Sequence, residues 1–252
     1  MSGPRQPGAR RLALHAGGEW PEGVVTPGAT LMVGGFGEPG TPFYLIDRLV
    51  AEGPGSLTVI KNDANEAGVG VGGLLRAGLL ARMITSHIGL NREMVAAMDA
   101  GEVEVEFQPQ GVLAEKIRCG GVGIPAFLTD IGVGILDGPA ADHTGERETL
   151  EWRGERYFLE PALRADVALL HAHRADRYGN LSYRLSARNF SPLMAMAADR
   201  VVVEVEELVD SPLDPELVHT PGSFVDHLVV VPPGFMPPTR AAGLQRSGVS
   251  AD

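Results

Sequence analysis

The sequence predicts an α/β fold with an open, largely parallel sheet and flanking helices. Short apolar runs, too short for helices and without a polar face, alternate along the chain with amphipathic segments of helical spacing. Glycine-rich or polar loops follow several of these runs. Because ligands in such sheets bind beyond the carboxyl ends of the strands, we expect the site among the loops at 34–40, 61–66, 86–91 and 108–111.

The composition describes a globular chain whose 252 residues have room for one large core, or for one core with a small lid. The formal net charge of -11 argues against binding of nucleic acid, which relies on Lys and Arg. No apolar run approaches the roughly 20 residues of a membrane-spanning helix, so we expect no membrane contact. Cys119 is the only cysteine, which excludes an intrachain disulfide and a cysteine zinc cluster and favours a cytoplasmic protein.

The first strand, loop and helix organise the chain. Leu31–Val33 is a buried strand and 43–52 an amphipathic helix, with Thr41 as its expected cap, Pro42 as its first residue and Gly53 as its end. Glycines between them permit a sharp turn and a close approach by a ligand. We expect the loop to present bare N–H groups to an anion at the helix N-terminus. The candidate binding residues are Gly34, Gly35, Phe36, Gly37, Glu38, Pro39 and Gly40.

The glycine loop taken alone permits two interpretations. A third, more specific one depends on motifs that occur later in the chain. Gly35, Gly37 and Gly40 spell G-x-G-x-x-G, which with Asp63 about twenty residues later is the pattern of a nucleotide-binding oxidoreductase. Glu38 would then lie unfavourably close to a pyrophosphate, and the proline after it removes one donor. A plain turn that binds no ligand is the other interpretation.

The remaining elements follow in order along the chain. We expect strands at 57–60, 82–86, 103–107, 164–171, 201–205 and 227–231. We expect helices at 74–81, 92–100, 112–118 and 191–198. Gly120–Pro125 is expected to form a second glycine-rich loop, and 137–156 a polar surface excursion. Residues 1–28 are expected to be a loose lead-in, 29–231 one domain, and 232–252 a proline-rich mobile tail.

Five segments together resemble one family. They are Leu31–Pro42, Ser86–Asn91, Gln108–Gly123, Arg174–Leu181 and Ser186–Leu193. In this order they look like the signature of family I coenzyme A transferases, so that 29–231 corresponds to a CoA-transferase α domain. The chain is most similar to the A (α) subunit of acetate/acetoacetate CoA-transferases, through Asp63, His87 and the run Ile117–Gly121.

The resemblance implies a reaction that needs a second subunit. In the family a glutamate carboxylate attacks an acyl-CoA thioester, forms an acyl-glutamyl anhydride and then a glutamyl-CoA thioester. This glutamate lies in a Ser-Glu-Asn-Gly motif of the β (B) subunit, and the motif is absent from this sequence. The resemblance therefore implies no catalytic residue in this chain, no cofactor apart from coenzyme A as a substrate, and a partner β subunit in an α2β2 assembly.

The resemblance also implies residue roles. Gly34–Gly40 matches the CoA-binding loop, and Asn62, Asp63 and Gln110 match positions that line a carboxylate pocket, with His87 beside them. Where the family has a second Asn, this chain has Asp63, whose charge would repel a second carboxylate by ~1 kcal/mol or more at 4 Å. We therefore expect acetate, butyrate or acetoacetate as the acid, with succinyl-CoA:3-oxoacid or 3-oxoadipate transfer as the alternative.

Several polar residues have ordinary interpretations. His171 and His173 share one strand face, as in some metal sites, but no third ligand is evident and we expect no metal. Arg174, Arg177 and Arg188 are candidates for contact with CoA phosphates or with the partner. A non-catalytic binding subunit that kept the fold is the remaining alternative to an enzyme.

Overall fold

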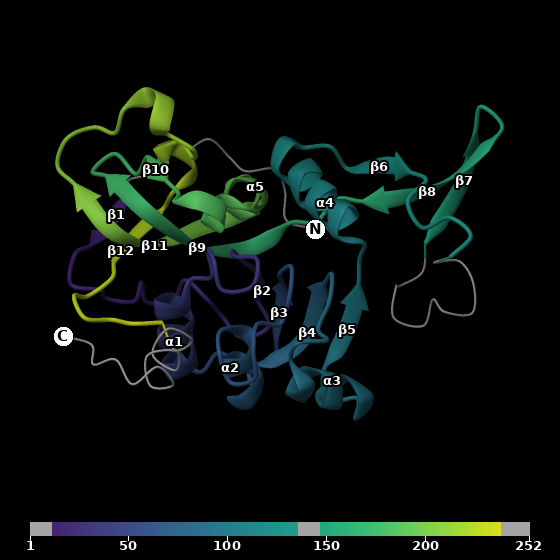
Figure 1. Ribbon diagram of the computed structural model, residues 1–252, viewed down its shortest axis with the longest axis horizontal. Helices are drawn as coiled ribbons and strands as arrows, with labels where there is room; N and C mark the ends of the chain where they lie inside the picture. The colour runs from purple at the N-terminus through teal and green to yellow at the C-terminus, as the bar shows by residue number, and fades with distance from the viewer. Residues whose placement is uncertain (1–11, 136–146, 238–252) are drawn as a thin grey trace.

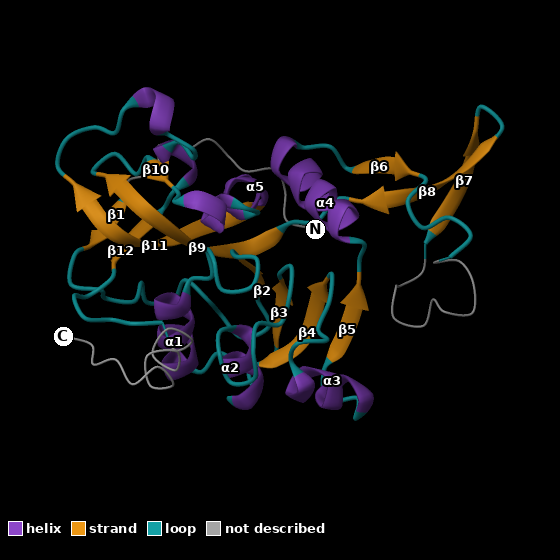
Figure 2. Cartoon of the chain, viewed as in Figure 1, coloured by secondary structure: helices purple, strands orange, loops and turns teal. Residues whose placement is uncertain are grey.

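The computed structural model describes residues 12–135 and 147–237. Within these ranges the main sheet has nine strands, and its order is β1-β12-β11-β9-β2-β3-β4-β5. Every neighbouring pair along this path is parallel, whereas β10 (Leu181–Ser182) pairs antiparallel with β9. The sheet is open, since it ends at β1 and β5, as Figure 2 shows. The predicted α/β class with an open, largely parallel sheet is confirmed.

The bounds of the path strands are as follows: β1 Ala13–His15, β2 Thr30–Val33, β3 Leu57–Ile60, β4 Leu80–Thr85, β5 Glu104–Phe107, β9 Ala165–Asp176, β11 Ala198–Val209 and β12 His227–Val230. The helices are α1 Phe43–Glu52, α2 Val71–Arg76, α3 Arg92–Asp99, α4 Gln110–Val122 and α5 Ser191–Ala197, with 3-10 turns η1 Leu185–Arg188, η2 Pro215–Leu217 and η3 Gly222–Phe224. None of the described helices is both long and apolar enough to span a membrane.

Helices cover both faces of the sheet (Figure 1), and the central strands β2 and β3 are accordingly almost wholly buried and apolar. Helices α1, α2 and α3 pack on one face and contribute to one core cluster, and α4 and α5 pack on the other. Successive side chains of a strand point to opposite faces, so Leu31 and Val33 of β2 belong to the first cluster and Met32 to the second. Because β2, β3 and β4 are adjacent and parallel, the loops that follow them lie at one edge of the sheet.

Two local predictions at the start of the chain differ from the structure. No strand was expected before residue 30, but β1 pairs parallel with β12, with Ala13 opposite His227. The helix expected at 74–81 is α2, which begins at Val71 and ends at Arg76. It ends early because Leu79 and Leu80 are buried against the sheet and Leu80 already begins β4.

The expected glycine-rich loop at Gly120–Pro125 is wrong over its first half. Gly120 and Gly121 lie inside α4, which ends only at Gly123 in the left-handed conformation. A Cβ on Gly120 would collide with the carbonyl oxygen of Leu163, and one on Gly121 would lie 2.7 Å from the Cβ of Met196. These glycines therefore permit close packing of the helix and do not form a loop.

A three-stranded antiparallel sheet occupies part of the expected surface excursion. It consists of β6 (Ala126–Thr129), β8 (Glu155–Pro161) and β7 (Glu148–Trp152), and β7 and β8 extend away from the main sheet (Figure 1). Arg153 and Gly154 both have positive φ, as a two-residue hairpin turn requires. Residues 137–146 of the expected excursion and 238–252 of the expected tail lie outside the described residues.

Candidate functional site

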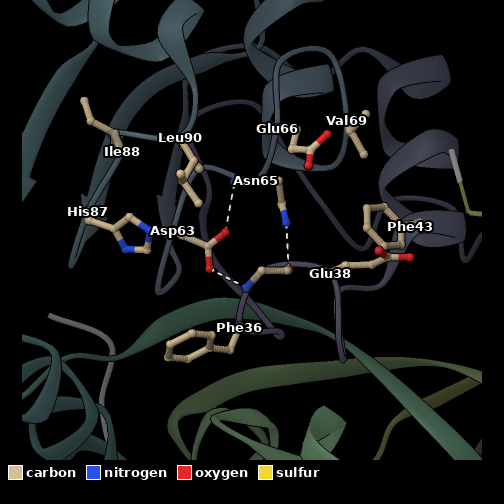
Figure 3. A pocket seen from close by; sticks show the side chains of 12 residues that line it. Phe36, Glu38, Phe43, Asp63, Asn65, Glu66, Val69, His87, Ile88 and Leu90 are labelled. Atoms are coloured by element: carbon tan, nitrogen blue, oxygen red, sulfur yellow. Dashed lines mark hydrogen bonds between the residues drawn. The ribbon is translucent and has the colours of Figure 1, made fainter. Parts of the chain in front are cut away.

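The middle of the glycine loop is held by the loop that follows β3. The Gly37 N–H donates to Oδ2 of Asp63 at 2.7 Å, and the Gly37 carbonyl accepts from Nδ2 of Asn65 at 2.8 Å (Figure 3). Oγ1 of Thr41 donates to the same carbonyl at 2.6 Å. The conformation of the glycine loop is therefore fixed by side chains from a neighbouring strand end as well as by its own turn.

Asp63 is a buried, fully bonded carboxylate. Besides Gly37, it accepts from Nδ2 of Asn62 at 3.1 Å and from the N–H of Asn65 at 2.9 Å. Nζ of Lys61, whose side chain is 0% exposed, lies 3.2 Å from Oδ1 of Asp63. Burial opposes the charged form of Asp63, but the Lys61 cation and the N–H donors outweigh it and lower the pKa of this carboxyl.

This ion pair removes the basis of one expectation. The predicted repulsion of a second substrate carboxylate assumed that the charge of Asp63 faces the pocket uncompensated. In the structure Lys61 compensates that charge from within the protein, and burial lowers the pKa of the Lys61 ammonium while Asp63 opposes this shift. Repulsion by Asp63 is therefore not a valid reason to prefer monocarboxylate substrates.

The four expected pocket residues lie together at the carboxyl edge of the sheet. Nε2 of Gln110, the first residue of α4, donates to Oδ1 of Asn62 at 2.7 Å. Oγ of Ser86 donates to the Asn62 carbonyl at 2.6 Å, and Asp63 pairs with His87 through an isolated parallel β-bridge. The loops after β3 and β4 and the start of α4 are thus joined by one series of hydrogen bonds.

A cavity of about 150 Å³, here the loop hollow, lies between the glycine loop and these polar loops. Its lining residues are Phe36, Gly37, Glu38, Phe43, Asp63, Ala64, Asn65, Glu66, Val69, His87, Ile88 and Leu90, most of which Figure 3 labels. Of the expected pocket residues, Asp63 and His87 line it, whereas Asn62 and Gln110 lie behind Asp63. Sequence reasoning missed its apolar wall of Phe43, Val69, Ile88 and Leu90, because these residues match ordinary core or surface positions.

The glycine loop does not present a row of bare N–H groups. Its donors are mostly taken within the protein: Gly35 donates to Oδ1 of Asn189, Phe36 to the Pro39 carbonyl and Thr41 to the Glu38 carbonyl. The chain also passes close to η1, since a Cβ on Gly40 would lie 2.5 Å from a carbonyl oxygen there. Most donors of this loop are therefore turned inward, and its role in binding CoA stays a prediction.

The start of α1 carries a carboxylate from a distant strand. Thr41 was expected to cap α1 and Pro42 to be its first residue, but the helix begins at Phe43 without a capping side chain from its own segment. Instead, Oε2 of Glu204 on β11 accepts from the Leu45 N–H at 2.9 Å. The Leu45 N–H at the helix N-terminus is therefore already taken by a carboxylate of the protein, which disfavours a pyrophosphate there and counts against the nucleotide-binding oxidoreductase.

A second cavity of about 420 Å³, here the histidine hollow, lies on the other side of the glycine loop. Glu38 and Phe43 line both hollows. His171 and His173 face this hollow and contact the carboxylates of Glu204 and Glu206 at 2.8 to 3.1 Å. Among the described residues no His, Cys, Asp and Glu group has the arrangement of a metal site.

One of the later motifs, Arg174–Leu181, has a structural role. The buried carboxylate of Asp176 accepts from the N–H groups of Tyr178 and Asn180 and holds the turn between β9 and β10. Of the expected arginines, Arg174 pairs with Glu207 at 2.7 Å, and Arg177 lies over the ring of Tyr178. Arg188 is exposed at the end of η1.

Comparison with known sequences finds coenzyme A transferases by a family model and by individual relatives. The family model described as Coenzyme A transferase matches residues 22–231. The A subunit of a succinyl-CoA:3-ketoacid coenzyme A transferase of Xanthomonas campestris is 49% identical over 209 residues, covering 82% of this chain and 84% of the relative. The alpha subunit of the acetate CoA-transferase of Escherichia coli is 46% identical over 209 residues, covering 82% of this chain and 92% of the relative.

Solved structures share the fold. The decarboxylase AibA/AibB matches with a TM-score of 0.73 and 27% identity over 95% of both chains. An acyl-CoA transferase of Escherichia coli O157:H7, solved as a thioester complex with CoA, matches with a TM-score of 0.77 and 24% identity. That match covers 90% of this chain, which spans 48% of the longer chain.

An open parallel sheet with polar loops gathered at its carboxyl edge around a glycine loop defines an α/β protein of the CoA-transferase type. The chain belongs to the coenzyme A transferase family. Its relatives are named as A or alpha subunits, which implies an enzyme with a second kind of subunit, with CoA among its substrates.

Proposed function

We propose that this chain is the α subunit of a heteromeric enzyme that moves CoA between a short-chain acyl-CoA and a short-chain carboxylate or 3-oxoacid. The match of the whole region 22–231 to the family carries this proposal, because it includes the glycine loop and each polar loop that meets it. In this proposal the attacking glutamate belongs to a Ser-Glu-Asn-Gly motif of the β subunit. Two α and two β subunits form a cytoplasmic complex.

The proposed chemistry needs a carboxylate that is oriented before it attacks. The glutamate oxygen adds to the thioester carbonyl and expels the CoA thiolate, which gives an acyl-glutamyl anhydride. The thiolate then attacks the glutamyl carbonyl, releases the first acid and leaves glutamyl-CoA, and a second acid repeats these steps in reverse. Orientation of the reacting groups supplies a large share of the rate enhancement in such a reaction.

The carboxylates around the loop hollow are poor candidates for that nucleophile. Asp63 has its oxygens occupied by Lys61 and by N–H donors. Glu38 and Glu66 line the hollow but are exposed, so water stabilises their charge and their side chains are not held in one orientation. This distribution supports an attacking residue from outside the chain.

The loop hollow has the character of a site for a short acyl group. Its apolar residues come from the glycine loop, from α1 and from the loops after β3 and β4, and His87 supplies a polar group beside the internally bonded side chains of Asp63 and Asn65. Small apolar cavities with few polar groups bind small molecules by shape and fix their orientation by hydrogen bonds. Phe36 is 47% exposed and Leu90 is 79% exposed at this site, an apolar surface that we assign to contact with the β subunit.

Co-expression with the candidate β subunit tests the proposal. Acyl exchange between acetyl-CoA and butyrate is expected only when both chains are present, and intact-mass spectrometry is expected to find the CoA adduct on the β subunit. Replacing the motif glutamate of that partner by glutamine should abolish both signals. Exchange by this chain alone, or a CoA adduct on it, would contradict the proposal.

The identity of the acyl donor remains a choice between two classes. Relatives at similar identity are named as acetate and as succinyl-CoA:3-ketoacid transferases. We retain acetate, butyrate or acetoacetate as the proposed acids. The pairing of Asp63 with Lys61 nevertheless favours transfer from succinyl-CoA more than the sequence did, because no uncompensated charge on Asp63 repels succinate. A competition assay with equal acetyl-CoA and succinyl-CoA, with acetoacetate as acceptor, distinguishes the two classes by the ratio of their kcat/KM values.

A further inference from the structure

The start of α1 is tied to the sheet by a series of charged groups that the proposed chemistry does not use. Glu204 is 2% exposed, and its two oxygens have different partners. Oε2 accepts from the Leu45 N–H in the first turn of α1, and Oε1 lies 2.8 Å from Nδ1 of His171. Glu204 and His171 are directly opposite each other on the parallel strands β11 and β9.

His171 is held on both ring nitrogens. Its Nε2 lies 3.1 Å from Oε1 of Glu206, while Oε2 of Glu206 lies 2.8 Å from Nδ1 of His173. A neutral imidazole has one N–H and can donate to only one carboxylate, whereas the imidazolium donates to both. Protonation of His171 satisfies both contacts at once and also compensates the buried charge of Glu204.

Movement of α1 would change both hollows. Phe43, the first residue of α1 and two positions before Leu45, lines the loop hollow and the histidine hollow. Glu38, within the glycine loop that leads into α1, also lines both. The position of Glu204 is thus transmitted through the first turn of α1 to the wall of the proposed acyl site.

We propose that Glu204 and His171 are a positioning pair, in which the protonated His171 fixes the Glu204 carboxylate and thereby fixes the start of α1 and the glycine loop. The effect of this pair on the rate of acyl transfer rests on the proposed CoA-transferase function. Its effect on the position of α1 does not.

The surrounding charges determine the pH range of the effect. Burial disfavours the charged ring, but hydrogen bonds to Glu204 and Glu206 outweigh it and raise the pKa of His171 to about 9. The hydrogen bond from His171 lowers the pKa of Glu206 to about 2. The histidine hollow also contains Glu38 and Arg184, and Asp47 of α1 has a raised pKa through burial and the charge of Glu204. Since the pKa of His171 in the folded chain lies above its ordinary value, the pair stays intact up to about pH 9. Its contribution to stability is fully present below pH 6.5 and is lost as the pH rises through about 9.

The kinetic test uses the full chain in complex with its β subunit, assayed from pH 6 to 10. We expect kcat/KM for acyl-CoA to fall above pH about 9 in the natural protein. His171→Gln should reduce kcat at pH 7.5 by about tenfold, in line with the cost of small misplacements in active sites, and should lose this alkaline transition. His171→Lys should restore most of the rate and move the transition upward, because a lysine ordinarily titrates near ~10.4.

Glu207→Gln is the matched control. Glu207 pairs with Arg174 between the same two strands at 2.7 Å, but both side chains are about half exposed and neither lines a hollow. This variant should keep the natural rate and pH profile. If His171 contributes only to stability, His171→Gln should have a lower melting temperature, but its kcat/KM should still fall at alkaline pH as in the natural protein. That result would overturn the proposal.

A measurement without activity separates this proposal from the proposed function. In the ¹⁵N-labelled full chain, the Leu45 amide resonance is expected to titrate with a midpoint near pH 9 and to be insensitive in this range in Glu204→Gln. An inactive complex with this titration would contradict the transferase function but support the positioning pair. A Leu45 amide that does not respond to pH in the natural chain would refute the pair even if the complex is active.

Discussion

Asp63→Asn tests whether the ion pair beneath the glycine loop has the importance that its burial indicates. The substitution keeps the size of the side chain and removes its charge. Lys61, with a side chain that is 0% exposed, then has no carboxylate partner, and the Gly37 N–H loses a charged acceptor at 2.7 Å. Both effects act on the same loop, so we expect a loss of stability and of activity together.

The expected magnitude follows from the burial of Lys61. Removing one partner of a buried ion pair typically costs ~3–5 kcal/mol, because an uncompensated charge remains. We expect about 3 kcal/mol for Asp63→Asn, since Lys61 can lose its proton to avoid part of that cost. For a chain of this size each kcal/mol shifts the melting temperature by ~2–4 °C, so the expected loss is ~6–12 °C.

The opposite substitution should be milder. In Lys61→Met the apolar stem is retained, and Asp63 keeps the N–H donors of Gly37, Asn62 and Asn65. The double variant should recover most of the stability lost in Asp63→Asn, since no buried charge is left unpaired. Thermal and denaturant unfolding of all four proteins, followed by circular dichroism, gives the coupling free energy directly. A coupling below ~0.5 kcal/mol, or equal losses for the two single variants, would refute the account of this pair.

Three further predictions concern packing and pH. Gly120→Ala should cost ~3 kcal/mol or more in denaturant unfolding, because its Cβ collides with backbone, whereas Gly111→Ala in the same helix meets open space and should change stability by less than ~1 kcal/mol. Gly40→Ala, with φ +81 and a carbonyl oxygen 2.5 Å from its Cβ, should reduce kcat of the complex about tenfold or more. Burial and the nearby His15 lower the pKa of His227, so its contribution to stability is present above pH 6.5 and is lost as the pH falls below it. His227→Gln should flatten that decrease in unfolding midpoints measured at pH 7.5 and 5.5.

The parts of the fold set by local pattern were predictable. The apolar run at 31–33, the helix at 43–52 and its end at Gly53 agree with the structure, because burial and left-handed glycine geometry depend on neighbouring residues. The polar residues after β3 and β4 were also found, since they follow directly from the ends of apolar strands. The sequence therefore located the edge of the sheet where these polar loops meet around the loop hollow.

The parts that depend on distant residues were not predictable from pattern. Gly120 and Gly121 resemble a loop in sequence, and only the proximity of Leu163 and Met196 explains why they belong to a helix. The β7–β8 hairpin has few apolar residues, so its charged composition indicated a surface loop although Arg153 and Gly154 have the turn geometry of a hairpin. For the two glycines, and for β8 through its pairing with β6, the deciding contact comes from a segment that local periodicity does not include.

The glycine loop shows how the two kinds of information combine. Its motif predicted a turn between a strand and a helix, and three anchors determine the conformation of that turn: Asn189 at Gly35, Asp63 at Gly37, and Glu204 at the start of α1. These anchors come from separate elements and consume donors that the motif alone would assign to a ligand. If the loop binds CoA as proposed, it would contribute shape and position more than free N–H donors, because these anchors occupy most of those donors.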